Sequence, residues 1–329
     1  MAKTERGIGV IRYEYIDSSI REEDIHPDLI FDKEREMARD FVTRITMPLD
    51  IKPCFVCHTP RHEILFQKWG CQYAICPESW TVSLASLPDE EILFNYYHSS
   101  EISRFRASMR YQSEVSKKRK ELWHSQIGWI EGRVSRYLGN DKYTVTDWGS
   151  KSVGWIDVLE TATFLDRLFV QEPLPPINET TDTNEQADII CLIDVLQRET
   201  EPHKLLKRIA SKLKPGGLFI VSCRAGSGFD VITLRENSKS IFPLDHVFLP
   251  SPRGMEILLK QAGFDVLELT TPGLLDMKYL KNAGSEIPKE QYFQRYIVEQ
   301  GDEFLLERMQ GFLQRNNLSS HLRCVAKRR

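Results

Sequence analysis

Residues 187–224 read ADIICLIDVLQRETEPHKLLKRIASKLKPGGLFIVSCR, and this stretch decides the fold class. The apolar run Ile189–Val195 is short and rich in β-branched residues, as expected of a strand that is buried on both faces. Glu201-Pro202 predicts the start of a helix, because proline suits the first helical turn. A second apolar run, Leu218–Cys223, predicts another buried strand.

The segment between these two strands has the pattern of an amphipathic helix that ends at a glycine turn. Its apolar residues recur at helical spacing, and basic residues fill the opposite side. The apolar set is Leu205, Leu206, Ile209 and Leu213. The turn 214–217, Lys-Pro-Gly-Gly, stops the helix because proline cannot continue it and glycine accepts positive φ. Strand, helix, turn and strand within 38 residues form a β-α-β unit, which predicts a parallel, helix-covered sheet.

Composition and charge narrow the class of protein. The chain of 329 residues is long enough to form two domains. Its contents of 41% hydrophobic and 28% charged residues are ordinary for a globular protein. The net charge of −3 gives no reason to expect a nucleic acid partner, and the basic run Lys117–Lys120 is interpreted as a solvated helix face. Without a signal-peptide core, an 18-residue apolar stretch or a regular cysteine framework, we expect a cytoplasmic protein with no membrane span.

The quoted stretch also resembles a known family. A strand ending in Asp194-Val195-Leu196, a helix beginning Glu201-Pro202 and the Lys-Pro-Gly-Gly turn are similar to the fourth and fifth strands of class I S-adenosylmethionine (SAM)-dependent methyltransferases. Gln261-Ala-Gly-Phe264 before a further predicted strand is also typical of that family. The resemblance covers about residues 140–329. It implies a doubly wound α/β fold, with a mostly parallel Rossmann-like sheet and an antiparallel last strand at Leu322–Lys327.

Four cysteines upstream of this region are candidate metal ligands. Cys54 and Cys57 form a Cys-x-x-Cys pair, and Cys71 and Cys76 follow. Four thiolates on two short loops can make a closed tetrahedral zinc site, which a small β-rich module needs in place of a core. The sequence therefore predicts a zinc-ribbon-like module over residues 51–88.

Other ligand sets remain open. Methyltransferases that act on sugars or polysaccharide precursors carry such a ribbon, and this chain resembles that subgroup. Their second pair is also Cys-x-x-Cys, which would place Ser79 at the fourth position. Cys71 could take that position instead, His58 or His62 could serve, or the ribbon could hold no metal.

The resemblance divides the chain into four parts. Residues 1–50 form an N-terminal extension, with a strand predicted over Ile8–Ile16 and a helix over Asp32–Ile45. The ribbon-like module is followed by a helical linker over residues 89–139 and a methyltransferase-like domain over 140–329. Tyr96 and Tyr97 in the linker are candidates for the substrate mouth. Two further helices are predicted within the last domain, over Gln291–Val298 and Glu303–Gln314.

The loop after the first predicted strand, Tyr143–Asp147, is the expected cofactor site, because nucleoside cofactors lie at the carboxyl ends of parallel strands where the strand order reverses. The family pattern there is acidic-x-Gly-x-Gly-x-Gly. Asp147 and Gly149 match it, Lys151 and Val153 replace the next two glycines, and Gly154 stands one place late. The resemblance thus implies SAM binding by Asp147, Gly149 and Gly154.

Two further acidic residues are predicted to contact the cofactor. Glu172 ends the predicted strand Arg167–Glu172, 25 residues after Asp147, where an acidic residue accepts hydrogen bonds from ribose hydroxyls. Asp194 would line the same site. Residues 173–186 show no third strand, although the family has one there. After Leu196 the family usually shows Glu-His, and this chain has Gln197-Arg198.

His246 is the predicted general base. It ends the element Ile241-Phe-Pro-Leu-Asp-His246, which is similar to an element over the active site of sugar-acting relatives. An imidazole with its ordinary pKa near 6.5 would suit a base for a hydroxyl acceptor. The resemblance therefore implies SAM-dependent methyl transfer to a small-molecule or sugar-type acceptor, in polysaccharide or related biosynthesis. The departures at the glycine loop, at the third strand and at Gln197-Arg198 support an alternative, an inactive methyltransferase-like protein that binds a protein partner.

Overall fold

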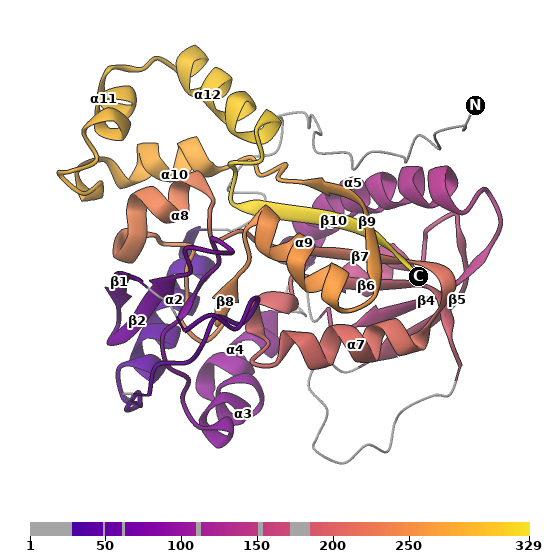
Figure 1. Cartoon of the computed structure of the whole chain (residues 1–329). Coiled ribbons are helices and arrows are strands. Elements are labelled where there is room, and N and C mark those ends of the chain that lie inside the picture. The colour runs from indigo at the N-terminus through magenta and orange to yellow at the C-terminus, as the bar shows by residue number, and fades with distance from the viewer. Residues whose placement is uncertain (1–27, 49, 61–62, 110–112, 151–153, 172–184) are drawn as a thin grey trace, which may run out of the picture.

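The structure, a computed structural model, describes residues 28–48, 50–60, 63–109, 113–150, 154–171 and 185–329, and the predicted strand Ile8–Ile16 lies outside them. A six-stranded sheet in the order β5-β4-β6-β7-β10-β9 forms its centre (Figure 1). The strands are β4 (Tyr143–Trp148), β5 (Leu165–Gln171), β6 (Ala187–Ile193), β7 (Leu213–Arg224), β9 (Phe264–Thr270) and β10 (His321–Arg328).

The strand directions confirm the predicted α/β fold. β5, β4, β6 and β7 are parallel neighbours, whereas β10 is antiparallel to both β7 and β9. β9 therefore runs parallel to β7, and the last strand of the chain is inserted between them in the opposite direction. Among the described residues β5 is the edge strand, and the segment in which the family has its third strand lies largely outside them.

The β-α-β unit forms where the sequence predicts it. α7 (Pro202–Lys212) begins on its proline and ends just before Leu213, which precedes the turn 214–217. Gly216 has a φ of +77°, and a Cβ on Gly217 would lie 2.8 Å from the backbone oxygen of Asp188, so this turn requires glycine at both positions. β7 starts earlier than predicted because Leu213 already pairs with Ala187 before the turn bulges out of the ladder.

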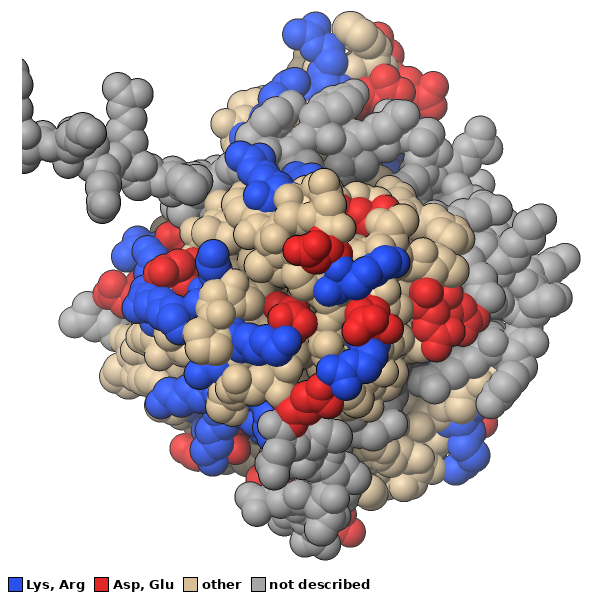
Figure 2. Space-filling model, turned by 90° about the vertical axis from the view of Figure 1, so that its right-hand side faces the viewer, with Lys and Arg blue, Asp and Glu red and all other residues tan. Residues whose placement is uncertain are grey.

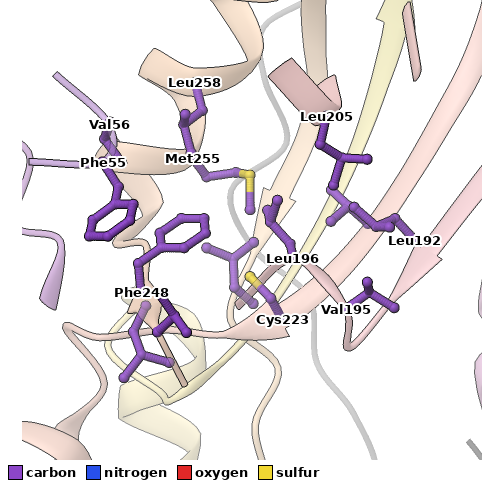
Figure 3. Packing of buried hydrophobic residues seen from close by; sticks show 14 of the residues in the cluster. Phe55, Val56, Leu192, Val195, Leu196, Leu205, Cys223, Phe248, Met255 and Leu258 are labelled. Atoms are coloured by element: carbon purple, nitrogen blue, oxygen red, sulfur yellow. The ribbon is translucent and has the colours of Figure 1, made fainter. Parts of the chain in front are cut away.

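Alternate residues of the strands face two different layers. Phe219 and Val221 belong to a core with α7 and α9 (Pro252–Gln261), part of which Figure 3 shows. Leu218 and Ile220 belong to a second core with α5 (Ser113–Tyr137) and α6 (Trp155–Leu159). Because helices cover both faces of β6 and β7, their stretches Ile189–Ile193 and Leu218–Val221 are apolar throughout rather than alternating.

The cysteine-bearing segment builds a small antiparallel sheet that is fused to the large domain. Its strands are β1 (Glu63–Lys68), β2 (Cys71–Ile75) and β3 (Val82–Leu84), and β8 (Phe248–Leu249) completes it from the C-terminal region. The rings of Phe55 and Phe248 stack with centroids 5.7 Å apart. Residues 51–88 thus share one core with α7 and α9, as the neighbouring side chains in Figure 3 show.

The helices outside the β-α-β pattern form two groups. On the ribbon side lie α2 (Asp28–Val42), α3 (Glu90–His98) and α4 (Glu101–Met109). The second group, at the upper left of Figure 1, contains α8 (Phe229–Leu234), α10 (Asp276–Ala283), α11 (Tyr292–Gln300) and α12 (Glu303–Arg315). α11 and α12 match the two predicted helices, whereas the short helices α8 and α10 were not predicted. The predicted linker contributes to both cores, through Tyr96 in one and Ile130 in the other.

Candidate functional site

The strand order reverses between β4 and β6, because the chain continues from β4 to β5 on one side and from β6 to β7 on the other. In doubly wound sheets a ligand binds in the crevice outside the carboxyl ends of the strands at this switch point. Asp147 and Gly149 lie at the end of β4, and Asp194 lies at the end of β6. The structure thus brings together three of the residues predicted to bind the cofactor.

Asp147 turns its carboxylate into the protein and fixes the loop that follows β4. The residue is fully buried, the indole Nε1 of Trp155 donates to Oδ1 at 2.7 Å, and the backbone nitrogen of Ser150 donates to Oδ2 at 3.0 Å. Burial raises the pKa of Asp147, although the donors on Ser150 and Trp155 oppose this shift. Asp147 therefore shapes the candidate site by holding its loop.

The loop leaves β4 with its backbone in a conformation that favours glycine. Gly149 has a φ of +82°, and Gly154, which precedes α6, has a φ of +75°. Lys151 and Val153, which replace the family's glycines, lie outside the described residues. Glu172, the predicted ribose contact, also lies outside them. Its role, like the other cofactor contacts, stays a prediction.

Asp194 occupies an unusual backbone conformation at the end of β6. Its φ is +57°, which for a residue other than glycine costs on the order of 1–3 kcal/mol and is concentrated at functional sites. The backbone nitrogen of Asp194 donates to the carbonyl of Ser222 at 3.0 Å, and the Ser222 hydroxyl donates to Asp194 Oδ1 at 3.2 Å. The nitrogen of Ile193 donates to the Ser150 hydroxyl at 3.3 Å, which ties the two loops together.

A group of polar residues that the sequence did not single out lies beside Asp194. Arg224 ends β7 and forms an ion pair with Asp230 of α8, whose side chain is fully buried. Burial raises the pKa of Asp230, and the Arg224 charge opposes this. His321 starts β10 opposite Arg224, and burial lowers its pKa to about 4 although Asp194 and Asp276 act in the other direction. Arg224 and His321 lie at strand ends, and only this position could have marked them in the sequence.

His246 lies in the loop before β8 with its ring held by the backbone. Its Nδ1 is 3.1 Å from both the nitrogen and the carbonyl oxygen of Phe242, and the Tyr73 hydroxyl donates to its carbonyl at 2.8 Å. Burial lowers the pKa of His246 to about 3, although the Asp245 charge opposes the shift. The imidazole is therefore neutral at pH 7, and its pKa lies well below the value of 6.5 that we expected for the base.

The stability of the protein should report this shift. Below about pH 6.5 the unfolded state binds a proton on His246, whereas the folded state does not until about pH 3. The free energy of unfolding therefore decreases as the pH falls from 6.5 toward 3. We expect wild type to lose up to about 1.4 kcal/mol per pH unit relative to His246→Gln between pH 6 and pH 4. Urea unfolding at each pH measures this gap. A gap that does not change with pH would contradict the shift.

Arg198, at the position where the resemblance predicts a histidine, belongs to an ion cluster around Asp245. Arg198 Nε lies 3.4 Å from Asp245 Oδ1, and Arg106 Nη1 donates to the same oxygen at 3.1 Å. The Tyr96 hydroxyl donates to Asp245 Oδ2 at 2.6 Å. Tyr96 is fully buried, and the hydroxyl of Tyr97 donates to the carbonyl of Leu244. Both tyrosine hydroxyls, predicted for a substrate mouth, thus hold the loop that carries His246.

Three of the four predicted metal ligands converge. The sulfur atoms of Cys54, Cys57 and Cys76 all lie within 4.8 Å of one another. Burial raises the pKa of Cys57 to about 12. The pKa of Cys76 is lowered, because burial is outweighed by hydrogen bonds from the side chain and backbone of Ser79. A close set of thiol groups fits zinc, whose preferred ligands include thiolates.

Cys71 and the two histidines do not join this group. Cys71 begins β2 and is fully buried, and burial raises the pKa of its thiol to about 12. The structure does not bring its sulfur into the converging group, which consists of Cys54, Cys57 and Cys76. The ring of His58 instead lies against His203, with centroids 4.6 Å apart. His62 lies outside the described residues.

Surface charge and helix composition are relevant to the expectation of neither a nucleic acid partner nor a membrane span. On the face shown in Figure 2, Lys and Arg side chains are interspersed with Asp and Glu side chains, which is typical of a solvated surface. The run Lys117–Lys120 lies in α5, and its side chains are outside the described ones. In the described part of the chain, no helix has the length and apolar character needed to cross a bilayer.

Comparison with known proteins agrees with this architecture. Residues 129–269 match a family described as a methyltransferase domain. Residues 129–269, which contain β4 to β8 and most of β9, therefore correspond to a class I SAM-dependent methyltransferase domain, and β10 lies outside the match. No curated protein matches the sequence.

Several solved structures are similar to the chain at low identity. Phosphoethanolamine N-methyltransferase 2 from Haemonchus contortus is 16% identical over 76% of this chain and 63% of that chain, with a TM-score of 0.42. The plantazolicin methyltransferase BpumL is 14% identical over 72% and 94%, with a TM-score of 0.42. Coclaurine N-methyltransferase is 12% identical over 92% and 88%, with a TM-score of 0.35. At these values the likeness supports no inference about an acceptor.

Proposed function

We propose that this protein transfers the methyl group of SAM to a small-molecule acceptor. The observation that carries the proposal is the convergence of Asp147, Gly149 and Asp194 at the carboxyl edge of the sheet where β4 and β6 diverge. This is the place where a doubly wound sheet binds a nucleoside cofactor. The match of residues 129–269 to a methyltransferase domain supports SAM as that cofactor.

The residues at this edge of the sheet fit the contacts that SAM would need. When bound, SAM would supply an activated methyl group on a sulfonium. Gly149 would let the backbone approach it closely, Asp194 would line the site, and Glu172 would accept hydrogen bonds from its ribose hydroxyls. Asp147 would hold the loop through Ser150 and Trp155. Methyl transfer depends mainly on alignment and exclusion of water, so few further side chains are needed.

We propose that His246 acts as the base: its imidazole is neutral and can accept a proton, although its lowered pKa makes it a weaker base than an ordinary histidine. Its loop lies against the segment after Asp194, because the nitrogen of Val247 donates to the carbonyl of Gln197 at 2.8 Å. A sugar-type acceptor would require a hydroxyl to be deprotonated during transfer, which is the role of such a base. The cysteine-bearing small sheet, which resembles the ribbon of the sugar-acting subgroup, supports this acceptor class and a role in polysaccharide biosynthesis.

We further propose that Cys54, Cys57 and Cys76 bind a structural zinc ion. The group lies on two short loops of a small sheet that has little core of its own, and its donors are the ones that zinc prefers. Metal binding to such loops contributes to folding directly.

Calorimetric titration of the purified full chain with SAM and with S-adenosylhomocysteine tests the methyltransferase proposal. We expect micromolar binding of both, corresponding to about −8 kcal/mol. Glu172→Ala should weaken it by roughly tenfold to a hundredfold, because hydrogen bonds to a charged group contribute about 1.5–3 kcal/mol. An acceptor screen would then be informative. If millimolar ligand produces neither heat nor a shift in melting temperature, the proposal fails.

One observation favours the alternative of a protein that has kept the fold and lost the reaction. Arg198 occupies the position where the resemblance predicts a histidine, and its guanidinium group forms an ion pair with Asp245. The chain would then bind a protein partner, for example an enzyme of polysaccharide assembly. Failure of the calorimetric test would point to this function, and affinity capture with the full chain would be the next experiment.

A further inference from the structure

The two loops that carry the cysteine triad have the same backbone hydrogen bonds. In the first loop the nitrogen of Cys54 donates to the carbonyl of Thr59 at 3.0 Å, and the nitrogen of His58 donates to the carbonyl of Cys54 at 2.9 Å. In the second loop the nitrogen of Cys76 donates to the carbonyl of Thr81 at 3.0 Å. The nitrogen of Trp80 donates to the carbonyl of Cys76 at 2.8 Å.

The fifth residue of each loop also adopts the same unusual conformation. His58 has a φ of +57° and Trp80 a φ of +56°, although neither is glycine. The loops Cys54–Thr59 and Cys76–Thr81 are therefore two copies of one turn. Their first positions are Cys54 and Cys76.

The fourth positions of the two copies are Cys57 and Ser79. Each of these side chains contacts the first residue of the other loop. Cys57 Sγ lies 3.5 Å from Cys76 Sγ, and Ser79 Oγ lies 3.3 Å from Cys54 Sγ. Ser79 is fully buried, and the nitrogen of Thr81 donates to its hydroxyl at 3.3 Å.

We infer that Ser79 holds the fourth position of a zinc site whose other three positions are Cys54, Cys57 and Cys76. This inference rests on the zinc binding proposed above and is independent of methyl transfer. Cys71 is the other candidate for this position, but its sulfur is not among the ligand atoms that lie within 4.8 Å of one another, which come from Cys54, Cys57 and Cys76. The choice left open by the sequence is thereby decided in favour of residue 79.

A serine instead of a cysteine at the fourth position predicts a site that binds zinc more weakly than four thiolates would. A neutral hydroxyl is not among the ligands that zinc prefers, so we expect the fourth position to contribute little to the affinity for zinc. Zinc should therefore exchange more readily here than at a closed structural site.

The site is also coupled to the large domain. The Ser251 hydroxyl, which caps α9, donates to the carbonyl of Ser79 at 2.5 Å and accepts from the nitrogen of Gly254 at 2.9 Å. A Cβ on Gly254 would lie 2.6 Å from the Thr81 hydroxyl oxygen, so the loop and the helix are closely packed. Zinc that binds the folded loops should raise the melting temperature of the whole chain.

The experiment compares zinc binding by the reduced full-length chain and four variants, using zinc itself in competition with a chromophoric chelator. We expect wild type to bind one zinc ion per chain, Cys76→Ser to lose it and Cys71→Ser to retain it. Ser79→Cys should bind at least tenfold more tightly than wild type. Ser83→Cys is the matched control, because Ser83 is also buried in the small sheet and its added thiol should leave the affinity unchanged.

The outcomes separate the two parts of the inference. If wild type binds no zinc, the proposed zinc site fails, whatever Ser79→Cys does. If wild type binds zinc but Cys71→Ser abolishes binding, or if Ser79→Cys gives no gain over Ser83→Cys, residue 79 is not the fourth position. Circular dichroism of each metal-free variant, and the cobalt(II) spectrum of each loaded one, distinguish a lost ligand from a lost fold.

Discussion

Replacing Asp245 with asparagine is expected to lower the free energy of unfolding by up to about 3–5 kcal/mol, because it removes the buried carboxylate that two partly buried guanidinium groups share. Only 3% of Asp245 is exposed, and its carboxylate lies between the guanidinium groups of Arg106 and Arg198. Arg106 retains Glu34, whose Oε1 lies 2.6 Å from its Nε. Urea unfolding of Asp245→Asn at pH 7 measures the loss.

The same variant should alter the response to acid. Burial alone would raise the pKa of Asp245, but Arg106 and Arg198 outweigh it and hold the pKa well below its usual range. A depressed folded-state pKa contributes stability that is present above the unfolded value of about 3.9 and is lost as the pH falls below it. The stability difference between wild type and Asp245→Asn should therefore narrow below about pH 4.

An exposed ion pair provides the control for Asp245. Arg329 Nε lies 2.7 Å from Asp265 Oδ1, with side chains that are 54% and 62% exposed. Asp265→Asn should cost less than about 1 kcal/mol, because exposed pairs contribute little. Equal losses in the two variants would show that burial of the Asp245 cluster does not matter, contrary to our interpretation.

Replacing Gly149 with valine is expected to weaken SAM binding at least tenfold. Gly149 has a φ of +82°, where a side chain costs about 1–2 kcal/mol and a β-branched one fits worst. Relief of this strain must move the loop after β4, which is the proposed cofactor site. A shift in binding of about 1.4 kcal/mol corresponds to a factor of ten. Calorimetric titration with S-adenosylhomocysteine measures it.

Gly263→Val is the matched control for this variant. Gly263 has a φ of +90° and no heavy atom within 4 Å of an added Cβ, so the backbone strain is similar. It precedes β9, which runs parallel to β7, and therefore lies at the opposite edge of the sheet from Gly149. Both variants should lose about 1–2 kcal/mol of stability, and only Gly149→Val should lose affinity. If Gly149→Val and Gly263→Val bind S-adenosylhomocysteine with equal affinity, the cofactor does not bind at the loop after β4.

Long-range packing explains the features that the sequence did not predict. Arg106 and Asp245 are 139 residues apart, and only the folded chain brings them together. The inward orientation of Asp147 depends on Trp155, and the lowered pKa of His246 depends on burial by other segments. The helices α8 and α10 are too short for a periodic pattern to be recognised, because they span only 6 and 8 residues.

The sequence by itself determined the sheet, its helix-covered faces and the β-α-β unit around Lys214–Gly217, because hydrophobic period and glycine turns are local properties. It also marked Asp147, Gly149 and Asp194 as neighbours, because the carboxyl ends of parallel strands meet at one edge. Tertiary structure alone decided which cysteines converge. The sequence predicted Cys71 as the fourth ligand and left Ser79, His58 and His62 as alternatives. The folded chain instead brings together Cys54, Cys57 and Cys76, and the repeated turn places Ser79 Oγ 3.3 Å from Cys54 Sγ.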